Sequence, residues 1–110
     1  MSTQKQDAFP ATVDGRVRAM DSIAPLYGAE DWDRVGLHVG DPARDLAGPV
    51  LLTIDLTERV LDEAIGSRAS AIVAYHPPIW TPLERVTAST ATERIVRGAI
   101  EAGIAVYSPH

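Results

Sequence analysis

The 110-residue chain contains no cysteine, and this absence excludes two kinds of structural element. Disulfide bridges and thiolate zinc sites both require cysteine sulfur. The candidate metal ligands are therefore the histidines and the acidic residues. The absence is also compatible with a reducing compartment.

Basic residues are too few to form a surface that binds nucleic acid. The chain has 10 Lys and Arg against 15 Asp and Glu, which gives a formal net charge of −5. A protein that binds a phosphate backbone usually carries a basic stripe, and this sequence has none. We therefore predict no nucleic-acid partner.

Long hydrophobic runs are also missing. No apolar segment reaches the roughly 20 residues that a membrane-spanning helix needs. Residues 1–10 are polar and lack the apolar middle of a signal peptide. We therefore expect no membrane partner and a cytoplasmic location. The length predicts one domain, with residues 1–12 as a flexible lead-in and residues 13–110 as a single α/β domain.

Apolar runs of strand length alternate with helical patterns along the chain. The predicted strands span residues 37–39, 50–54, 71–75 and 104–107. The predicted helices begin at the caps Thr12, Thr57 and Thr90. Helical crossovers between short buried strands predict a parallel sheet of βαβαβ type, with a mixed sheet as the alternative.

The apolar spacing also predicts which surfaces are buried. The last two helices are expected to bury Val60, Leu61, Ala64 and Ile65, and Ile95, Val96, Ala99 and Ile100, respectively. The strands lack strict alternation, so we expect the sheet to be covered on both faces.

Chemically active residues follow each predicted parallel strand. They are Asp55, His76 and His110, and both histidines lie beside a proline that stiffens the backbone. Carboxyl ends of parallel strands meet at one sheet edge, and imidazole with carboxylate is a transition-metal ligand set. His76 is the first candidate ligand, and His110 and Asp55 are further candidates. The alternative is that strand ends are simply polar. His38 is expected to be a loop or edge-strand residue without a metal role.

Four segments of the chain form a recognisable set. They are Glu30–Leu37 with Gly40–Pro42, Thr53–Thr57, Ala74–Trp80 and Ala105–His110. In this order and spacing, they resemble the N-terminal part of the Nif-three-like (NGG-interacting-factor-like) dinuclear metal family. Many members of that family carry the name type 2 GTP cyclohydrolase I. The resemblance extends from about residue 13 to residue 110.

The resemblance implies two divalent metal ions, zinc, manganese or iron, at the carboxyl edge of the sheet. Family members usually carry two adjacent histidine ligands where this chain has Tyr75 and His76. Tyr75 thus takes the place of one ligand, although a neutral phenol binds zinc or manganese poorly. The family's remaining ligands follow the position of His110, so the resemblance implies an incomplete site. Asp55 and His110 would orient water or move protons.

The resemblance also implies a metal-dependent hydrolase that acts on a nucleotide and forms a homo-oligomer, a ring-shaped hexamer in the family. The chain would correspond to about half of the family fold, truncated at its C-terminus, and we expect exposed apolar surface and association through it. One alternative is a non-catalytic binding or regulatory protein with a residual metal half-site. Another is a different metallohydrolase class with a His-Pro turn, against which the loop around Trp32 argues.

Overall fold

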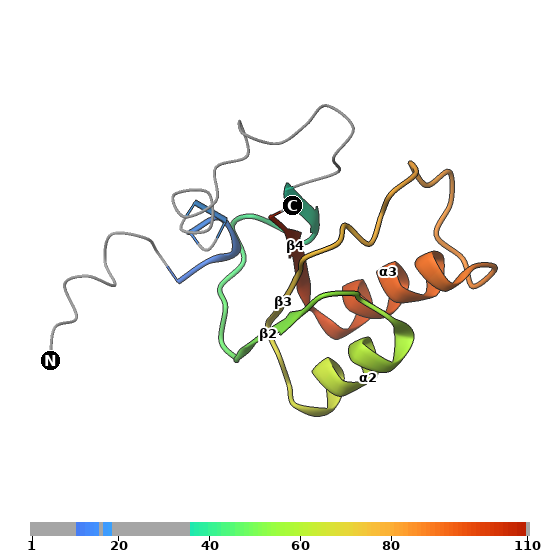
Figure 1. Cartoon of the computed structure of the whole chain (residues 1–110). Coiled ribbons are helices and arrows are strands. Elements are labelled where there is room, and N and C mark those ends of the chain that lie inside the picture. The colour runs from blue at the N-terminus through green and yellow to red at the C-terminus, as the bar shows by residue number, and fades with distance from the viewer. Residues whose placement is uncertain (1–10, 16, 19–35, 110) are drawn as a thin grey trace, which may run out of the picture.

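A mixed four-stranded sheet is the centre of the computed structural model, which describes residues 11–15, 17–18 and 36–109 (Figure 1). Its strands are β1 (Gly36–Val39), β2 (Val50–Thr53), β3 (Ala71–Ala74) and β4 (Ala105–Ser108), and its helices are α2 (Glu58–Gly66) and α3 (Ala91–Ala102). The spatial order is β1-β4-β3-β2. β2, β3 and β4 are parallel, and β1 pairs antiparallel with β4. The predicted α/β fold is confirmed, and β1 makes the sheet mixed.

The predicted N-terminal helix is described only at its start. Residues 13–15 and 17–18 are helical, and the Gly15 N–H donates to Thr12 Oγ1 at 3.0 Å. This hydrogen bond confirms Thr12 as the helix cap. Residues 1–10 and 19–35, which include most of the predicted lead-in and the loop around Trp32, lie outside the described residues.

Threonine caps begin both later helices, as predicted. Thr57 Oγ1 accepts from the Val60 N–H, and Thr90 Oγ1 accepts from the Glu93 N–H, each at 3.2 Å. Gly103 ends α3 with a φ of 72°, a left-handed conformation that glycine adopts without steric cost.

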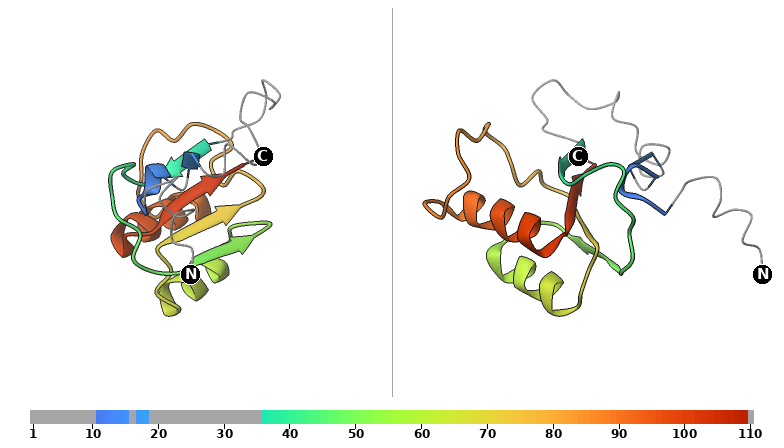
Figure 2. Two further views of the ribbon diagram at one scale, coloured as in Figure 1. Left: turned by 90° about the vertical axis from the view of Figure 1, so that its left-hand side faces the viewer. Right: turned by 180° about the vertical axis from the view of Figure 1, so that it is seen from behind.

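Both helices pack on the same side of the sheet (Figure 2). Leu61 and Ala64 of α2 and Ile95, Val96 and Ala99 of α3 are buried there. A Cβ on Gly98 would lie 2.7 Å from Leu61 Cδ2, so this glycine allows the two helices to approach closely. The expectation that Ile65 and Ile100 are buried is wrong, because both lie at the border of their apolar stripe and are 43% and 59% exposed.

The opposite face of the sheet is largely open at β2. Leu52 is 75% exposed and Val50 is 42% exposed, while their neighbour Leu51 packs toward the helices. A wholly apolar groove of about 230 Å³ runs over this face, between β2 and the first helical residues. The expectation of a sheet covered on both faces is therefore wrong for β2, which is an edge strand with only one face packed.

The lengths of the helices bear on membrane association. Within the described part of the chain, neither α2 nor α3 is long and apolar enough to cross a bilayer.

Candidate metal centre

The carboxyl edge of the sheet brings together residues from three consecutive strands. β2, β3 and β4 run in the same direction, so the residues that follow them emerge at one edge. Asp55 follows β2, His76 follows β3, and Ser108 ends β4. The convergence predicted for Asp55 and His76 is thus present in the fold.

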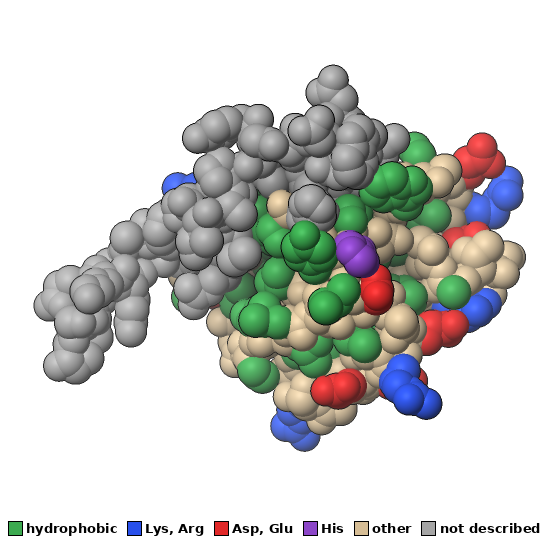
Figure 3. Space-filling view, in the orientation of Figure 1, with side chains coloured by type: hydrophobic (Ala, Val, Ile, Leu, Met, Phe, Trp, Pro, Cys, Tyr) green, Lys and Arg blue, Asp and Glu red, His purple; other side chains and the backbone are tan. Residues whose placement is uncertain are grey.

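Asp55 and His76 form a hydrogen-bonded pair. His76 Nδ1 lies 2.7 Å from Asp55 Oδ1, and both side chains are more than half exposed, at 54% and 66%. Figure 3 shows a histidine against an acidic side chain on this surface, with hydrophobic side chains around them. Because the carboxylate accepts from Nδ1–H, the other ring nitrogen, Nε2, carries the lone pair when the imidazole is neutral.

Backbone hydrogen bonds continue the parallel ladder beyond the ends of the strands. The Tyr75 N–H donates to Thr53 O, and the His76 N–H donates to Ile54 O, both at 2.9 Å. These bonds bring His76 alongside the turn that carries Asp55. From the other side, the fully buried Ser108 Oγ donates to Tyr75 O at 3.3 Å. The sheet itself therefore positions the pair.

Tyr75 lies beside the pair. Its ring is tilted by 54° against the His76 ring, with 5.1 Å between the ring centroids. The residue is 48% exposed. The two rings are therefore in tilted contact, and Tyr75 packs against the His76 ring.

His38 contacts the segment that follows His76. Its Nδ1 accepts from the Ile79 N–H at 3.3 Å, across 41 residues of sequence. Sequence reasoning predicts the edge strand that carries His38, and β1 confirms it. It misses this contact, since no periodicity relates the two positions.

The described residues do not form a complete set of metal ligands. They contain no cluster of three or more His, Cys, Asp or Glu side chains that could hold a metal ion. His110 lies outside the described residues. His76 Nε2 fits one ligand position, with Asp55 as its hydrogen-bond acceptor, whereas a catalytic zinc usually takes three protein ligands. The residues thus fit a metal as one ligand and its orienting carboxylate.

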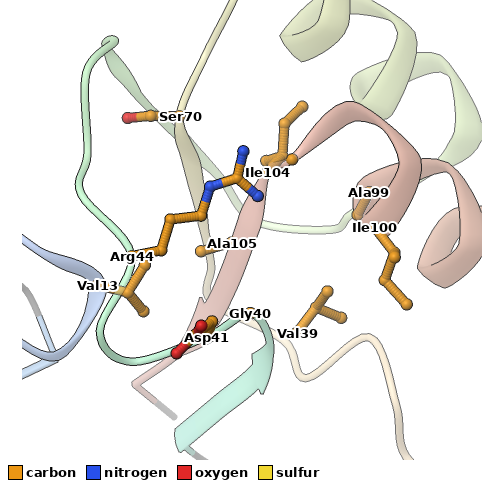
Figure 4. A pocket seen from close by; sticks show the side chains of 11 residues that line it. Val13, Val39, Gly40, Asp41, Arg44, Ser70, Ala99, Ile100, Ile104 and Ala105 are labelled. Carbon is orange, nitrogen blue, oxygen red and sulfur yellow. The ribbon is translucent and has the colours of Figure 1, made fainter.

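A separate hollow of about 290 Å³ lies at the amino ends of β3 and β4 (Figure 4). Arg44 reaches into it toward Gly103, and a Cβ at Gly103 would clash with the guanidinium. Asp41 points to another side of the hollow (Figure 4). The Arg44 guanidinium lies at the C-terminal end of α3, where a positive charge stabilises the helix dipole. The position of Arg44 in this hollow is therefore explained by a structural role.

Comparison with known proteins identifies the family. The family model described as Duf34/NIF3 (NGG1p interacting factor 3) matches residues 11–110. NIF3-like protein 1 of Drosophila melanogaster is 44% identical over 94 residues, which cover 86% of this chain and 32% of that protein. The GTP cyclohydrolase 1 type 2 homolog of Listeria innocua is 34% identical over 91 residues, which cover 83% of this chain and 24% of that protein.

A solved structure shows the same fold. The crystal structure of Staphylococcus aureus hypothetical protein SA1388 matches with a TM-score of 0.85 and 31% identity, over 92% of this chain and 28% of that one. The chain therefore spans between about a quarter and a third of the length of these relatives. The family match over residues 11–110 confirms the resemblance seen in the sequence: the chain belongs to the Duf34/NIF3 (NGG1p interacting factor 3) family.

Proposed function

We propose that this chain carries one ligand, and the residue that orients it, for a divalent-metal site of a hydrolase that acts on a nucleotide. The observation that carries the proposal is the hydrogen bond between His76 Nδ1 and Asp55 Oδ1 at 2.7 Å. Histidines that bind metal commonly donate their second ring N–H to a carboxylate, which fixes the tautomer and the ring orientation. His76 has this arrangement at the carboxyl edge of the three parallel strands.

Each residue of the site has a distinct role in the proposal. His76 binds the metal through Nε2, and Asp55 holds the ring proton on Nδ1. Tyr75 packs against the His76 ring. His110 orients water or moves a proton near the metal. The bound metal, zinc, manganese or iron, supplies the Lewis acidity that makes water a better nucleophile near neutral pH.

The remaining ligands must come from outside the described residues, because these contain no complete ligand cluster. The match to NIF3-like protein 1 covers 32% of that protein, so we place them in the part of the family fold beyond the match. We propose that the assembled site lies in a homo-oligomer and binds two metal ions.

The nucleotide substrate is proposed from a relative. The Listeria innocua protein carries the name GTP cyclohydrolase 1 type 2 homolog and is 34% identical to this chain. A cyclohydrolase reaction begins with attack of water on a ring carbon of the purine, a step that fits metal-assisted activation of water.

Metal titration tests the proposal. Purified protein is dialysed against Zn²⁺, Mn²⁺ or Fe²⁺, its metal content is measured, and the affinity is determined by calorimetry for the wild type and for His76→Ala. Because the chain supplies one protein ligand, we expect it to bind at least one of these metals with an affinity that His76→Ala lowers. Tyr75→Phe is the matched control, because it keeps the stacked ring and removes the phenol oxygen. Equal affinities of the wild type and His76→Ala for all three metals overturn the proposal for this chain.

The alternative function is a non-catalytic binding or regulatory protein with a residual half-site. The absence of a three-residue ligand cluster among the described residues favours it. Under this alternative, the wild type releases no product from GTP with metal present, and His76→Ala leaves partner binding unchanged. Turnover of GTP by the wild type and its loss in His76→Ala would instead support the hydrolase.

A further inference from the structure

Residues 76–79, which begin with His76, have few backbone donors and are called here the His-Pro-Pro arm. Pro77 and Pro78 have no N–H and hold φ near −65°. Ile79 therefore offers the first backbone N–H after His76. That N–H donates to Nδ1 of His38 at 3.3 Å, and the bond is partly buried.

The other end of the arm is fixed by the sheet and by Asp55. The His76 N–H donates to Ile54 O at 2.9 Å, and the His76 side chain is bonded to Asp55 at 2.7 Å. Between these contacts and Ile79, the two prolines leave only ψ rotations free. The Ile79–His38 bond is thus the distal anchor of a short, stiff arm.

We propose that His38 is a positioning residue, which sets the direction of His76 Nε2 by holding the far end of the His-Pro-Pro arm. The role rests on the proposed function in one respect, namely that Nε2 is the atom that binds metal. The contact itself is independent of metal. His38 lies on β1 and His76 follows β3, so the bond also couples the antiparallel edge strand to the metal edge of the sheet.

The geometry specifies the chemical state of His38. An acceptor at Nδ1 requires a lone pair there, so the neutral ring carries its proton on Nε2. Asparagine places its Oδ1 at a similar position along the side chain and also accepts a hydrogen bond. Leucine has a similar size but no acceptor. The pair His38→Leu and His38→Asn therefore separates the hydrogen bond from side-chain bulk.

The experiment uses the isotope-labelled full 110-residue chain. Amide hydrogen exchange of Ile79, the chemical shifts of the His76 ring and the affinity for Zn²⁺ are measured in the wild type and in both variants. In His38→Leu we expect Ile79 to exchange at least about fivefold faster, in line with loss of one hydrogen bond. We also expect shifted His76 ring signals and about tenfold weaker Zn²⁺ binding, the lower end of effects for groups that orient a ligand. His38→Asn should restore all three readouts toward the wild-type values.

Two results overturn the inference. One is an unchanged Ile79 exchange rate in His38→Leu. The other is faster exchange with wild-type His76 ring signals, since the bond would then not position His76. If the wild type binds no Zn²⁺ but the exchange and ring signals respond as expected, the proposed metal function fails and the positioning role of His38 stands.

Discussion

His76 Nδ1 and Asp55 Oδ1 lie 2.7 Å apart, although 21 residues separate them in the sequence. The bond directs Nε2 of His76 away from Asp55, so Asp55 would orient His76 as the proposed metal ligand. We predict that Asp55→Ala weakens Zn²⁺ binding by about 10- to 100-fold, the range found when such partners are removed. Calorimetric titration measures the change. Asp62→Ala, which removes an equal charge from the exposed surface of α2, should bind as the wild type does.

Equal Zn²⁺ affinities for Asp55→Ala and the wild type would show that His76 needs no carboxylate partner. A loss of the same size in Asp62→Ala would assign the effect to net charge.

Gly103 should be intolerant of a side chain. Its φ of 72° is left-handed, and the guanidinium of Arg44 occupies the space that a Cβ would need. We expect Gly103→Ala to lower the free energy of unfolding by about 1–2 kcal/mol, mainly from the backbone conformation, since the long Arg44 side chain can move aside. Urea unfolding measures the loss.

Gly66 provides the matched control for that substitution. It is the last residue of α2, and a Cβ there would meet no atom within 4 Å. We expect Gly66→Ala to stabilise the protein by up to about 1 kcal/mol. A loss in Gly66→Ala as large as that in Gly103→Ala would contradict this account of both glycines.

Glu93 makes stability depend on acid pH. The O–H and N–H of Thr87 both donate to its carboxylate, and these hydrogen bonds lower the pKa of Glu93 below its ordinary value of 4.5. A lowered folded-state pKa contributes stability that is complete above about pH 4.5 and is lost as the pH falls through the lowered pKa. We expect the thermal midpoint to drop in this acid range.

The variant Thr87→Val tests that assignment, because it keeps the backbone donor and removes the hydroxyl. Its thermal midpoint should fall less steeply between pH 5 and about pH 3 than that of the wild type. Thr81→Val, at an exposed position in the same loop, should keep the wild-type slope. Identical slopes for all three proteins would show that Thr87 does not stabilise the ionised Glu93.

The open sheet face should make the isolated chain associate. Leu52 is 75% exposed and borders the apolar groove over β2. We predict concentration-dependent self-association in sedimentation experiments, and we expect Leu52→Glu to reduce it. Ile100→Glu changes a similarly exposed residue, at 59%, on α3 and should have a smaller effect. A sharp monomeric thermal transition of the wild type at micromolar concentration would contradict this prediction.

The elements of this fold are predictable from local patterns. Thr57 and Thr90 are recognisable as caps because each precedes an apolar helical repeat, and the structure confirms both. The direction of β1 is not predictable in this way, since a short apolar alternation around His38 fits a parallel strand and an antiparallel strand equally well. Only its pairing with β4 makes the strand antiparallel.

Burial is less predictable than the elements. A run such as Val50–Thr53 has the composition of a strand covered on both faces, yet its position at the sheet edge leaves Leu52 exposed. Periodicity identifies the side of α3 that faces the core but not the width of the covered stripe, and Ile100 falls outside it. Both differences depend on which elements are neighbours, which is a property of the whole fold.

The candidate site, like the fold, is predictable from the sequence only in part. Parallel strand ends share an edge, so the proximity of Asp55 and His76 follows from the strand directions alone. The ring nitrogen that meets the carboxylate depends on the turn after β2 and the ladder beyond β3. The contact of His38 with Ile79 depends on β1 lying beside β4, which no local pattern contains.

The strand order has a consequence for the sequence of folding events. β2, β3 and β4 are neighbours in sequence and in space, each joined to the next by one helix, so their pairing closes only short loops. β1 pairs with the far end of the chain, Gly36 opposite Ser108, and this closure has the larger entropic cost. We expect β1 amides to gain protection after β3 amides in pulse-labelled hydrogen exchange during refolding. The His-Pro-Pro arm would then acquire its distal anchor only at the last step, so that a metal-competent His76 marks a completely folded sheet.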